Sequence, residues 1–282
     1  MSPPQEIIII RFSSIGDILL TTPLLRVLKN NFPDANITFV TKNAYTCLME
    51  NNPHADRVLA LPESGSLREL IRLREKALEQ HPDMVIDLHG NIRSLIFRCL
   101  LPGRHLRSRK QTVSRINTVL FKKKPQNRFS AAERYFTAVE DLNLVPDSRG
   151  LSFFSGETPQ DLDAIRSAGV PLDAPCLVTV CPGAGRESKQ WPETYFGVLL
   201  PLLREKGYTP VLAGSPAEAD LCDRISGLAD ESVPVVAGKL SLRQTGILLA
   251  HSRVSVCNDS GLMHLSTAVD TPVCGFFGPT TQ

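Results

Sequence analysis

The chain has 282 residues, more than one hydrophobic core usually serves, which favours two domains. Apolar residues make up 42% and charged residues 21%, and no apolar run reaches the roughly 18 residues that a membrane-spanning helix needs. The start lacks the basic flank of a secretory signal, and the seven cysteines contain no C-x-x-C pair. We therefore expect a cytoplasmic protein with free thiols.

The net charge of +2 hides a split between the two halves of the chain. Residues 1–150 carry 22 Lys or Arg against 15 Asp or Glu, whereas residues 151–282 carry 9 against 14. Between positions 93 and 128 there are eleven Lys or Arg, two Phe, and no acid, Tyr or Trp. Such a run is either a solvated face or a site for an anionic glycolipid or membrane surface. Nucleic acid is disfavoured because aromatic stacking partners are few.

Short apolar strands alternate with helical patterns along the first half. Strands are predicted at 6–12, 37–42, 57–61 and 84–90, and helices near 17–30, 43–51 and 66–80. Continuously apolar strands separated by helices indicate a parallel sheet covered on both faces. Residues 144–160 are rich in Pro, Gly and Ser and are predicted to connect two domains, 1–150 and 151–282.

The second half repeats the pattern, which predicts a second doubly wound α/β unit. Strands are predicted at 176–181, 209–214, 233–238, 253–259 and 272–278, and helices near 193–206, 216–229, 241–251 and 260–269. Ligands of such sheets bind at the carboxyl ends of the strands. We therefore expect an interdomain cleft, with functional residues in the turns that follow strands.

The first such turn is "RFSSIGDILLTTP", residues 11–23. Ser13 or Ser14 can cap the coming helix, Gly16 allows a tight turn, and Asp17 falls in the first helical turn. Asp17 either complements the helix dipole or points into the cleft as a general base. Its position alone does not decide between these roles.

The second turn is "CPGAGRESKQWPE", residues 181–193. Gly183 and Gly185 leave backbone N–H groups free to approach a phosphate, and Arg186 and Lys189 add positive charge. The spacing matches neither the P-loop nor G-x-G-x-x-G, so this signal is weak by itself.

The third turn is "NDSGLMH", residues 258–264. Asp259 and Ser260 are typical N-cap residues, and the helix they start favours an anion at its N-terminus. Because Asp259 would repel a bare phosphate, we expect it to accept hydrogen bonds from backbone amides or from a sugar hydroxyl. His264 follows Ser260 by one turn and faces the same side, as a ligand contact or as a packed side chain.

Two further motifs have ordinary alternatives. "DLD", residues 161–163, resembles the acid-x-acid metal motif of many sugar transferases but is expected to be solvated helix surface. In "LHGNIRS", residues 88–94, the polar side chains either contact an acceptor or cap a helix, and we favour the acceptor. Those side chains are His89, Asn91 and Arg93.

Together these motifs resemble the ADP-heptose–lipopolysaccharide heptosyltransferases, glycosyltransferase family nine. The matching pieces keep the family's order along the whole chain. They are "RFSSIGDILLTTPLLRVLK", "DLHGNIRS", "SKQWPE", "AGSPAE" and "NDSGLMHLSTAVDTPVCGFFGPT". The resemblance implies a GT-B fold of two Rossmann-like domains. The N-terminal domain would bind the anionic lipopolysaccharide-core acceptor and the C-terminal domain the nucleotide-sugar donor.

The resemblance also implies roles for individual residues. Asp17 becomes the catalytic base, with Ser14, Gly16, His89, Asn91 and Arg93 on the acceptor side. The donor side comprises Gly185, Arg186, Lys189, Glu218, Asp259, Ser260, Gly261 and His264. In these roles Lys189 contacts the phosphates and Glu218 holds the ribose. The implied reaction is an inverting transfer of heptose from ADP-heptose, without a metal or other cofactor. It takes place in the cytoplasm, with peripheral contact at the inner membrane.

Two departures keep alternatives open. Ala184 and Gly185 stand where family members often have threonines, which leaves room for a different donor sugar. The chain also ends at "FGPTTQ", earlier than expected for the second domain, so a non-catalytic relative that binds nucleotide or glycolipid is a second alternative. A dinucleotide oxidoreductase is disfavoured because neither first turn carries the glycine fingerprint.

Overall fold

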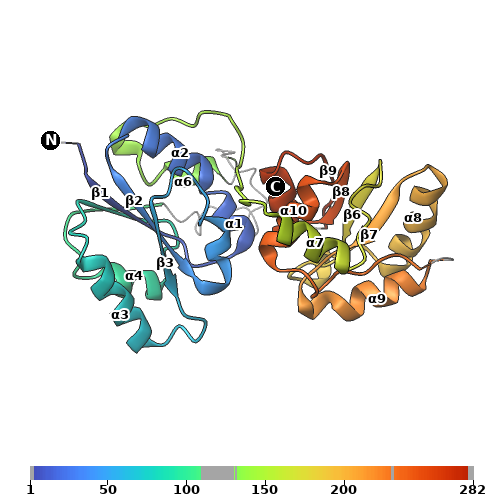
Figure 1. The fold of residues 1–282 in the computed structure, drawn as a ribbon. Helices are drawn as coiled ribbons and strands as arrows, with labels where there is room; N and C mark the ends of the chain where they lie inside the picture. The colour runs from blue at the N-terminus through green and yellow to red at the C-terminus, as the bar shows by residue number, and fades with distance from the viewer. Residues whose placement is uncertain (1–2, 109–129, 131, 230–231, 279–282) are drawn as a thin grey trace, which may run out of the picture. The chain divides into compact units, whose positions relative to one another are not determined.

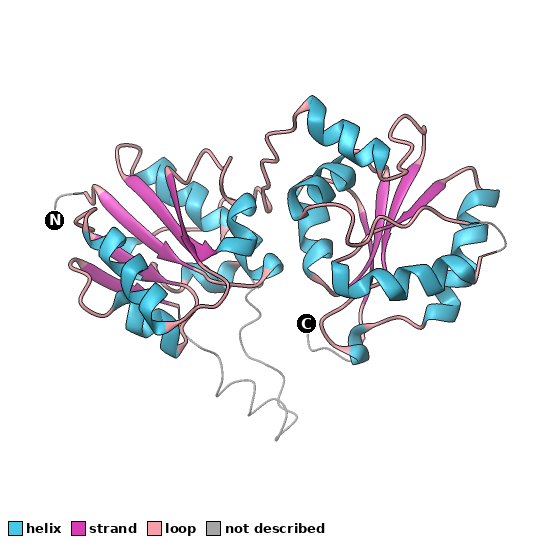
Figure 2. Ribbon diagram, turned by 60° about the horizontal axis from the view of Figure 1, so that its bottom comes forward, coloured by secondary structure: helices cyan, strands magenta, loops and turns pink. Residues whose placement is uncertain are grey.

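The computed structural model describes residues 3–108, 130, 132–229 and 232–278. The basic run from 93 to 128 therefore lies partly outside the described residues. The chain divides into two compact units, Met1–Arg149 and Gly150–Gln282. Each unit is an α/β structure with helices on both faces of a parallel sheet (Figures 1 and 2).

The first unit is a five-stranded parallel sheet in the order β3-β2-β1-β4-β5. Its strands are β1 (Glu6–Ile10), β2 (Asn36–Lys42), β3 (Arg57–Leu61), β4 (Met84–Asp87) and β5 (Arg104–Arg107). Its α-helices are α1 (Ile15–Leu19), α2 (Thr22–Asn31), α3 (Leu67–Leu78), α4 (Ile92–Arg98) and α6 (Glu133–Phe136). Two 3-10 helices, η1 (Asn43–Leu48) and η2 (Glu140–Leu142), lie in its connections.

The central strand β1 forms the core of the first unit. Its isoleucines, residues 7–10, are at most 1% exposed, and alternation sends them to both faces of the sheet. Ile8 and Ile10 pack with residues of α3 and α4, including Leu70, Leu73 and Phe97. Because β1 lies between β2 and β4, the turn that follows it is at the middle of the carboxyl edge.

The second unit has a four-stranded parallel sheet in the order β7-β6-β8-β9. Its strands are β6 (Leu177–Cys181), β7 (Thr209–Leu212), β8 (Val254–Asn258) and β9 (Val273–Phe276). Its α-helices are α7 (Pro159–Ser167), α8 (Glu193–Glu205), α9 (Ala219–Gly227), α10 (Leu242–Ala250) and α11 (Gly261–Ala268). The 3-10 helices η3 (Glu187–Lys189) and η4 (Pro216–Glu218) follow β6 and β7.

Three predicted elements differ from the structure. The helix near 17–30 is two helices, because α1 ends at Leu19 and Pro23 starts a new first turn in α2. The helix near 43–51 is the 3-10 helix η1. The strand at 233–238 is reduced to a single bridge between Val235 and Leu212, because Pro234 has no N–H to donate to a ladder.

The bridge at Val235 shows that both units use one topology. Val235 lies next to β7, at the place that β3 takes beside β2 in the first sheet. Both sheets therefore follow the Rossmann order 3-2-1-4-5. β5 was not predicted, because its sequence RHLR is charged and buries one side chain, that of Leu106.

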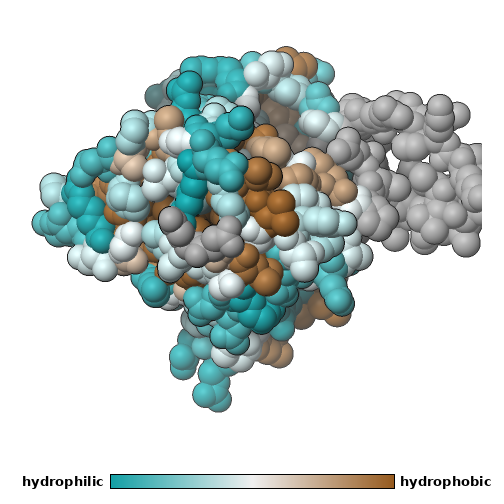
Figure 3. All heavy atoms as spheres, turned by 90° about the vertical axis from the view of Figure 1, so that its right-hand side faces the viewer, coloured by the Kyte–Doolittle hydropathy of each residue, from teal (hydrophilic) through white to brown (hydrophobic). Residues whose placement is uncertain are grey.

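Helix α8 exposes a row of apolar side chains on the second unit. Tyr195, Val198 and Leu202 are 54%, 61% and 48% exposed and recur at the spacing of one helix face. Figure 3 views the side that carries α8 and α9 and shows apolar side chains among hydrophilic ones. Among the described residues, no helix is long and apolar enough to cross a membrane.

Candidate active site

Asp17 lies in the turn between β1 and α1 of the first unit. Ser14 is the N-cap of α1, and the carboxylate of Asp17 accepts its N–H at 3.4 Å and its hydroxyl at 3.1 Å. Arg11, one residue after β1, places its guanidinium 2.7 Å from the Asp17 Oδ2 atom. The Asp17 side chain is 34% exposed, whereas Gly16 beside it is buried. Asp17 thus caps its helix and still reaches solvent.

The surroundings of Asp17 keep it ionised at neutral pH. Burial raises the pKa of the carboxyl, but the charge of Arg11 and the donors of Ser14 and Arg11 outweigh burial and hold the pKa below its usual value. The hydroxyl of Tyr135, on α6, donates to Oδ1 at 3.2 Å. Burial raises the pKa of Tyr135 to about 12, so the phenol stays protonated as a donor.

The turn after β4 carries the predicted acceptor residues. Asn91 is the N-cap of α4 and accepts the N–H of Ser94 at 2.9 Å, so its side chain serves as a helix cap. His89 packs edge-on against Phe12 with ring centroids 5.3 Å apart. Burial, together with the charge of Arg11, lowers the pKa of His89 to about 4, which makes the imidazole neutral. Arg93 is exposed.

The buried carboxylate of Asp87 holds the turn after β4 through hydrogen bonds. Asp87 is 2% exposed and accepts the backbone N–H of His89 at 3.0 Å and of Gly90 at 2.8 Å. It also accepts the hydroxyl of Ser94 at 2.9 Å. These contacts fix the backbone from which His89 projects.

Two turns of the second unit are joined by an ion pair. The Lys189 ammonium, in η3, lies 2.6 Å from Oδ2 of Asp259, which follows β8. The two side chains are 27% and 20% exposed, so the pair is partly shielded from water. Gly185 and Arg186, earlier in the same turn, are exposed.

Asn258, the last residue of β8, holds these two turns together. Its amide donates to the Pro182 carbonyl at 2.6 Å and accepts the Trp191 N–H at 3.1 Å, and the residue is fully buried. The Trp191 ring stacks on Phe276 of β9 with centroids 4.2 Å apart. Both ends of the segment that carries Lys189 are therefore fixed to neighbouring strands.

Helix α11 starts in the same region. Ser260 is its N-cap, and the Ser260 Oγ atom is buried without a hydrogen-bond partner among the described residues. Gly261 is the first residue of α11 and His264 the fourth, and both are partly buried. The predicted anion site thus has the expected helix N-terminus.

Glu218 joins the turns after β6 and β7. Its carboxylate accepts the N–H and hydroxyl of Ser215 at 2.7 and 2.8 Å, which closes η4. A Cβ atom at Gly183 would lie 1.8 Å from Oε1 of Glu218, so a larger residue there would displace the Glu218 carboxylate from this position. The structure therefore groups the predicted donor residues at the carboxyl edge of the second sheet.

The comparisons with known proteins identify the family. The sequence profile of glycosyltransferase family 9 (heptosyltransferase) matches residues 70–282, about three quarters of the chain. The chain belongs to this family. It is 25% identical over 291 residues to lipooligosaccharide heptosyltransferase 2 of Haemophilus influenzae, a match covering 98% of this chain and 84% of that protein.

Two further matches agree with the family assignment. The chain is 28% identical over 281 residues to lipopolysaccharide heptosyltransferase 3 of Escherichia coli K12, covering 94% of this chain and 80% of that protein. The crystal structure of the family 9 glycosyl transferase from Veillonella parvula matches with a TM-score of 0.81 at 22% identity. That match covers 98% of this chain and 81% of the other. The predicted family, the glycosyltransferase class and the GT-B fold class of two Rossmann-like units are confirmed.

The "DLD" motif of this glycosyltransferase is partly a structural cap. Asp161 is 8% exposed, forms the capping box of α7 with Thr158, and pairs with Arg243 at 2.7 Å. The prediction of solvated surface is therefore wrong for Asp161, because its contacts with Thr158 and Arg243 bury the carboxylate. It holds for Asp163, whose side chain is 76% exposed. No group of three potential metal ligands occurs among the described residues.

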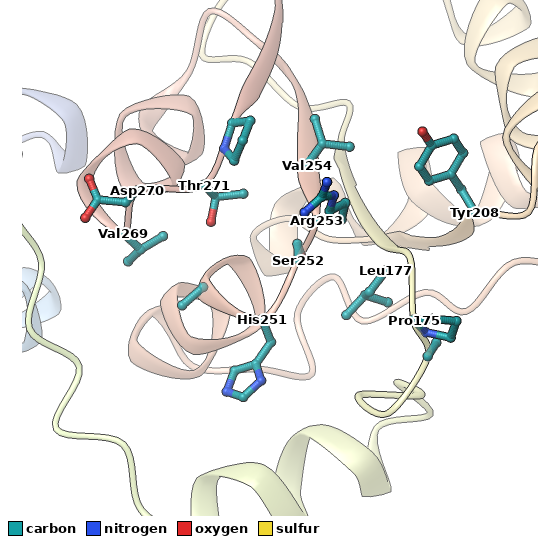
Figure 4. Close-up of a pocket in the computed structure, with 13 residues that line it drawn as sticks. Pro175, Leu177, Tyr208, His251, Ser252, Arg253, Val254, Val269, Asp270 and Thr271 are labelled. Atoms are coloured by element: carbon teal, nitrogen blue, oxygen red, sulfur yellow. The ribbon is translucent and has the colours of Figure 1, made fainter.

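A cavity of about 690 Å³ lies at the other end of the second sheet (Figure 4). Its lining includes Leu177 and Val254, the first residues of β6 and β8, together with Tyr208 and Arg253. It is therefore at the amino edge of the strands, away from the predicted donor residues. His251 in its wall is bound to Glu157 at 2.8 Å.

Several residues of the candidate site were not predicted from the sequence. Arg11 and Asn258 lie inside the quoted motifs but were given no role. Tyr135 lies 118 residues from Asp17, and no local pattern connects them. A contact of this kind is visible only once the chain has folded.

We predict that Asn258→Ala loosens the turn that carries Lys189. The substitution leaves the Pro182 carbonyl and the Trp191 N–H without their partner, at a cost of about 1–3 kcal/mol for each buried group. Unfolding followed by emission of Trp191, the single tryptophan, should shift to lower denaturant concentration. Gln190→Ala is the matched control, because Gln190 donates to a carbonyl of the same turn from an exposed position. Equal midpoints for the two variants would contradict the role of Asn258.

Proposed function

We propose that this glycosyltransferase moves heptose from ADP-heptose to a hydroxyl of an anionic lipopolysaccharide inner-core acceptor, with Asp17 as general base. This proposal rests mainly on the Asp17 carboxylate, which is ionised and partly exposed at the carboxyl edge of the first sheet. The family and the heptosyltransferase relatives support heptose as the transferred sugar.

The proposed step is a direct displacement. The acceptor oxygen forms a bond to the anomeric carbon while the bond from that carbon to the diphosphate oxygen breaks. Asp17 takes the acceptor proton, and ADP leaves with the electron pair and one additional negative charge. A single displacement inverts the anomeric configuration, and no metal takes part in the proposed step.

The leaving ADP is stabilised by residues of the second unit in this proposal. Lys189 and the N-terminal amides of α11, from Ser260 and Gly261 onwards, favour the growing charge on the diphosphate. The exposed amides at Gly185 and the Arg186 side chain add donors. Glu218 holds the ribose, and His264 supports the α11 turn.

The acceptor is assigned to the first unit. Ser14 and Gly16 shape the turn around Asp17, and His89, Asn91 and Arg93 contribute the turn after β4. The charge excess of residues 1–150 suits the phosphates and carboxylates of a core acceptor. We assign the reaction to the cytoplasm, with peripheral contact at the inner membrane.

We predict that Asp17→Asn abolishes transfer but keeps nucleotide binding. The amide preserves shape and cannot take a proton, so kcat should fall by about 10²–10⁴-fold. The Kd for ADP, measured by calorimetry, should stay within about twofold because the donor residues belong to the other unit. Asp56→Asn is the control, since Asp56 is a comparably exposed carboxylate paired with Lys29. If Asp17→Asn has a rate close to that of the parent, Asp17 is not the base. If the parent binds ADP but does not turn over, the protein is a non-catalytic relative.

We predict that Lys189→Met weakens ADP binding. Loss of a charge-assisted contact costs about 1.5–3 kcal/mol, or roughly 10- to 100-fold in Kd, and leaves Asp259 uncompensated beside the phosphates. Lys206→Met, at an exposed position at the end of α8, should bind ADP as the parent does. In thermal-shift assays ADP and ADP-heptose should stabilise the parent, and EDTA should leave the rate unchanged. Stabilisation by UDP or GDP sugars alone would indicate another donor.

We predict that acceptor and membrane binding depend on salt. The basic run between 93 and 128 attracts anions over a Debye length of about 8–10 Å at physiological salt. When salt rises from about 0.05 to about 0.5 M, the fraction of protein that sediments with anionic liposomes should fall and the acceptor KM should rise. We expect each quantity to change by about tenfold or more. Binding that ignores salt would identify the run as solvated surface.

A further inference from the structure

The contacts of Asp17 are divided unevenly between its two carboxylate oxygens. Oδ2 accepts from the Ser14 N–H at 3.4 Å, the Ser14 hydroxyl at 3.1 Å and the Arg11 guanidinium at 2.7 Å. Oδ1 accepts the Tyr135 hydroxyl at 3.2 Å. Each carboxylate oxygen offers about two lone-pair sites. Three donors therefore saturate Oδ2, while the one donor found for Oδ1 among the described residues leaves it a lone pair.

We propose that Arg11 and Tyr135 are positioning residues, which hold the Asp17 carboxylate so that Oδ1 takes the proton of the acceptor hydroxyl. This inference rests on the proposed role of Asp17 as general base. It adds the identity of the basic atom and two residues that act through Asp17 without touching the reacting atoms.

Arg11 is fixed on three sides. One terminal nitrogen donates to the Leu88 carbonyl, just after β4, at 2.6 Å, and the other pairs with Asp17. The guanidinium lies 5.5 Å from the centroid of the Tyr135 ring, a cation–π distance. The side chain is 13% exposed. Because its planar fork is held by a carbonyl and a ring, Arg11 imposes one orientation on the carboxylate.

Tyr135 approaches the other oxygen from a different part of the chain. It lies on α6, is 2% exposed, and its ring is covered on one side by Arg11. A buried ring has little freedom to turn, so the position of its hydroxyl is well defined. Oδ2 is thus anchored by Arg11 and Ser14, and Oδ1 is anchored by Tyr135 through one of its lone pairs.

Arg11 also sets the charge state of the base. Among the described residues, the titratable groups next to this turn include Tyr135, which stays protonated, and His89, whose pKa of about 4 makes it neutral near pH 7. The charges of Asp87 and Lys42 also act on His89, and the Arg134 guanidinium lies 5.7 Å from the centroid of the Tyr135 ring. Burial acts on Asp17 in the opposite direction to Arg11 and raises its pKa. Without Arg11, less would oppose the effect of burial, so the pKa of Asp17 would be higher and the carboxylate would be protonated at a higher pH.

The proton is accounted for in each turnover. It passes from the acceptor hydroxyl to Oδ1 as the new glycosidic bond forms, and Asp17 becomes a neutral acid. The Arg11 charge then has no carboxylate partner, which favours return of the proton to water before the next turnover. A base with a lowered pKa is weaker but remains ionised over a wider pH range.

The test is the pH profile of kcat/KM for the acceptor between pH 4.5 and 8. The parent should be level down to about pH 5, because Asp17 stays ionised. Arg11→Met should move the acid limb up by about one to three pH units, the effect of removing an opposite charge. Arg57→Met is the matched control, since Arg57 forms a surface pair with Glu6 at 3.8 Å. It should keep the parent profile.

Tyr135→Phe tests positioning with little change in packing. We expect kcat to fall by about 10- to 100-fold, as for a misplaced catalytic group, with KM for the acceptor within about twofold. The acid limb should also move upward, because a donor to the ionised carboxylate is lost. Circular dichroism and the Kd for ADP establish that both variants are folded.

The outcomes separate this inference from the proposed function. If Asp17→Asn turns over like the parent, Asp17 is not the base and the proposed function fails. If Asp17→Asn is inactive but the acid limb of Arg11→Met stays at the same pH as that of the parent, the positioning role of Arg11 is overturned. A Tyr135→Phe enzyme with parental kcat and profile overturns the role of Tyr135. An upward limb in Arg11→Met with reduced kcat in Tyr135→Phe supports both roles.

Discussion

Charge compensation at the carboxyl edge of each sheet is the constraint on which both groups of candidate site residues depend. Parallel strands with helical crossovers collect all their strand-to-helix turns at one edge, so charged residues gather there. Asp17 is paired with Arg11 at 2.7 Å, and Lys189 with Asp259 at 2.6 Å. Removing one partner of such a partly shielded pair leaves the other charge without compensation. Lys189 and Asp259 belong to different turns, so their pairing links the turn after β6 to the turn after β8.

In the second unit, hydrogen bonds and close packing also hold the carboxyl edge of the sheet in place. Asn258 fixes the turn after β6 at both ends, and the Glu218 carboxylate fills the space that the absent side chain of Gly183 leaves. At Gly278 a Cβ atom would lie 2.1 Å from the Ser188 carbonyl, so a third turn packs onto η3. Amides held in this way need little reorganisation when charge develops in front of them, which is the condition for electrostatic catalysis.

Local patterns predicted what is decided locally. The strand β1 is a continuous apolar run, and Asp17, Lys189 and Asp259 lie in turns that follow strands, so their place at a carboxyl edge could be inferred. β5 could not, because an edge strand with a charged sequence has no apolar signature, and Pro234 reduced an apolar run to one bridge. Arg11, Tyr135 and Asn258 act through contacts between distant segments, which periodicity and capping rules do not encode.

The pairing of Lys189 with Asp259 explains how an acidic residue can lie at the proposed binding site of a diphosphate. Asp259 alone would repel a diphosphate at the start of α11, but the ion pair has no net charge, and the amides of the helix N-terminus still favour an anion. A sugar diphosphate and a free diphosphate differ by the charge that appears when the glycosidic bond breaks. Lys189 is already held 2.6 Å from the Asp259 carboxylate. Its attraction to the diphosphate is strongest when the diphosphate carries its full charge. In the proposed reaction, these groups would therefore stabilise the leaving group more than the bound donor and so lower the barrier to transfer.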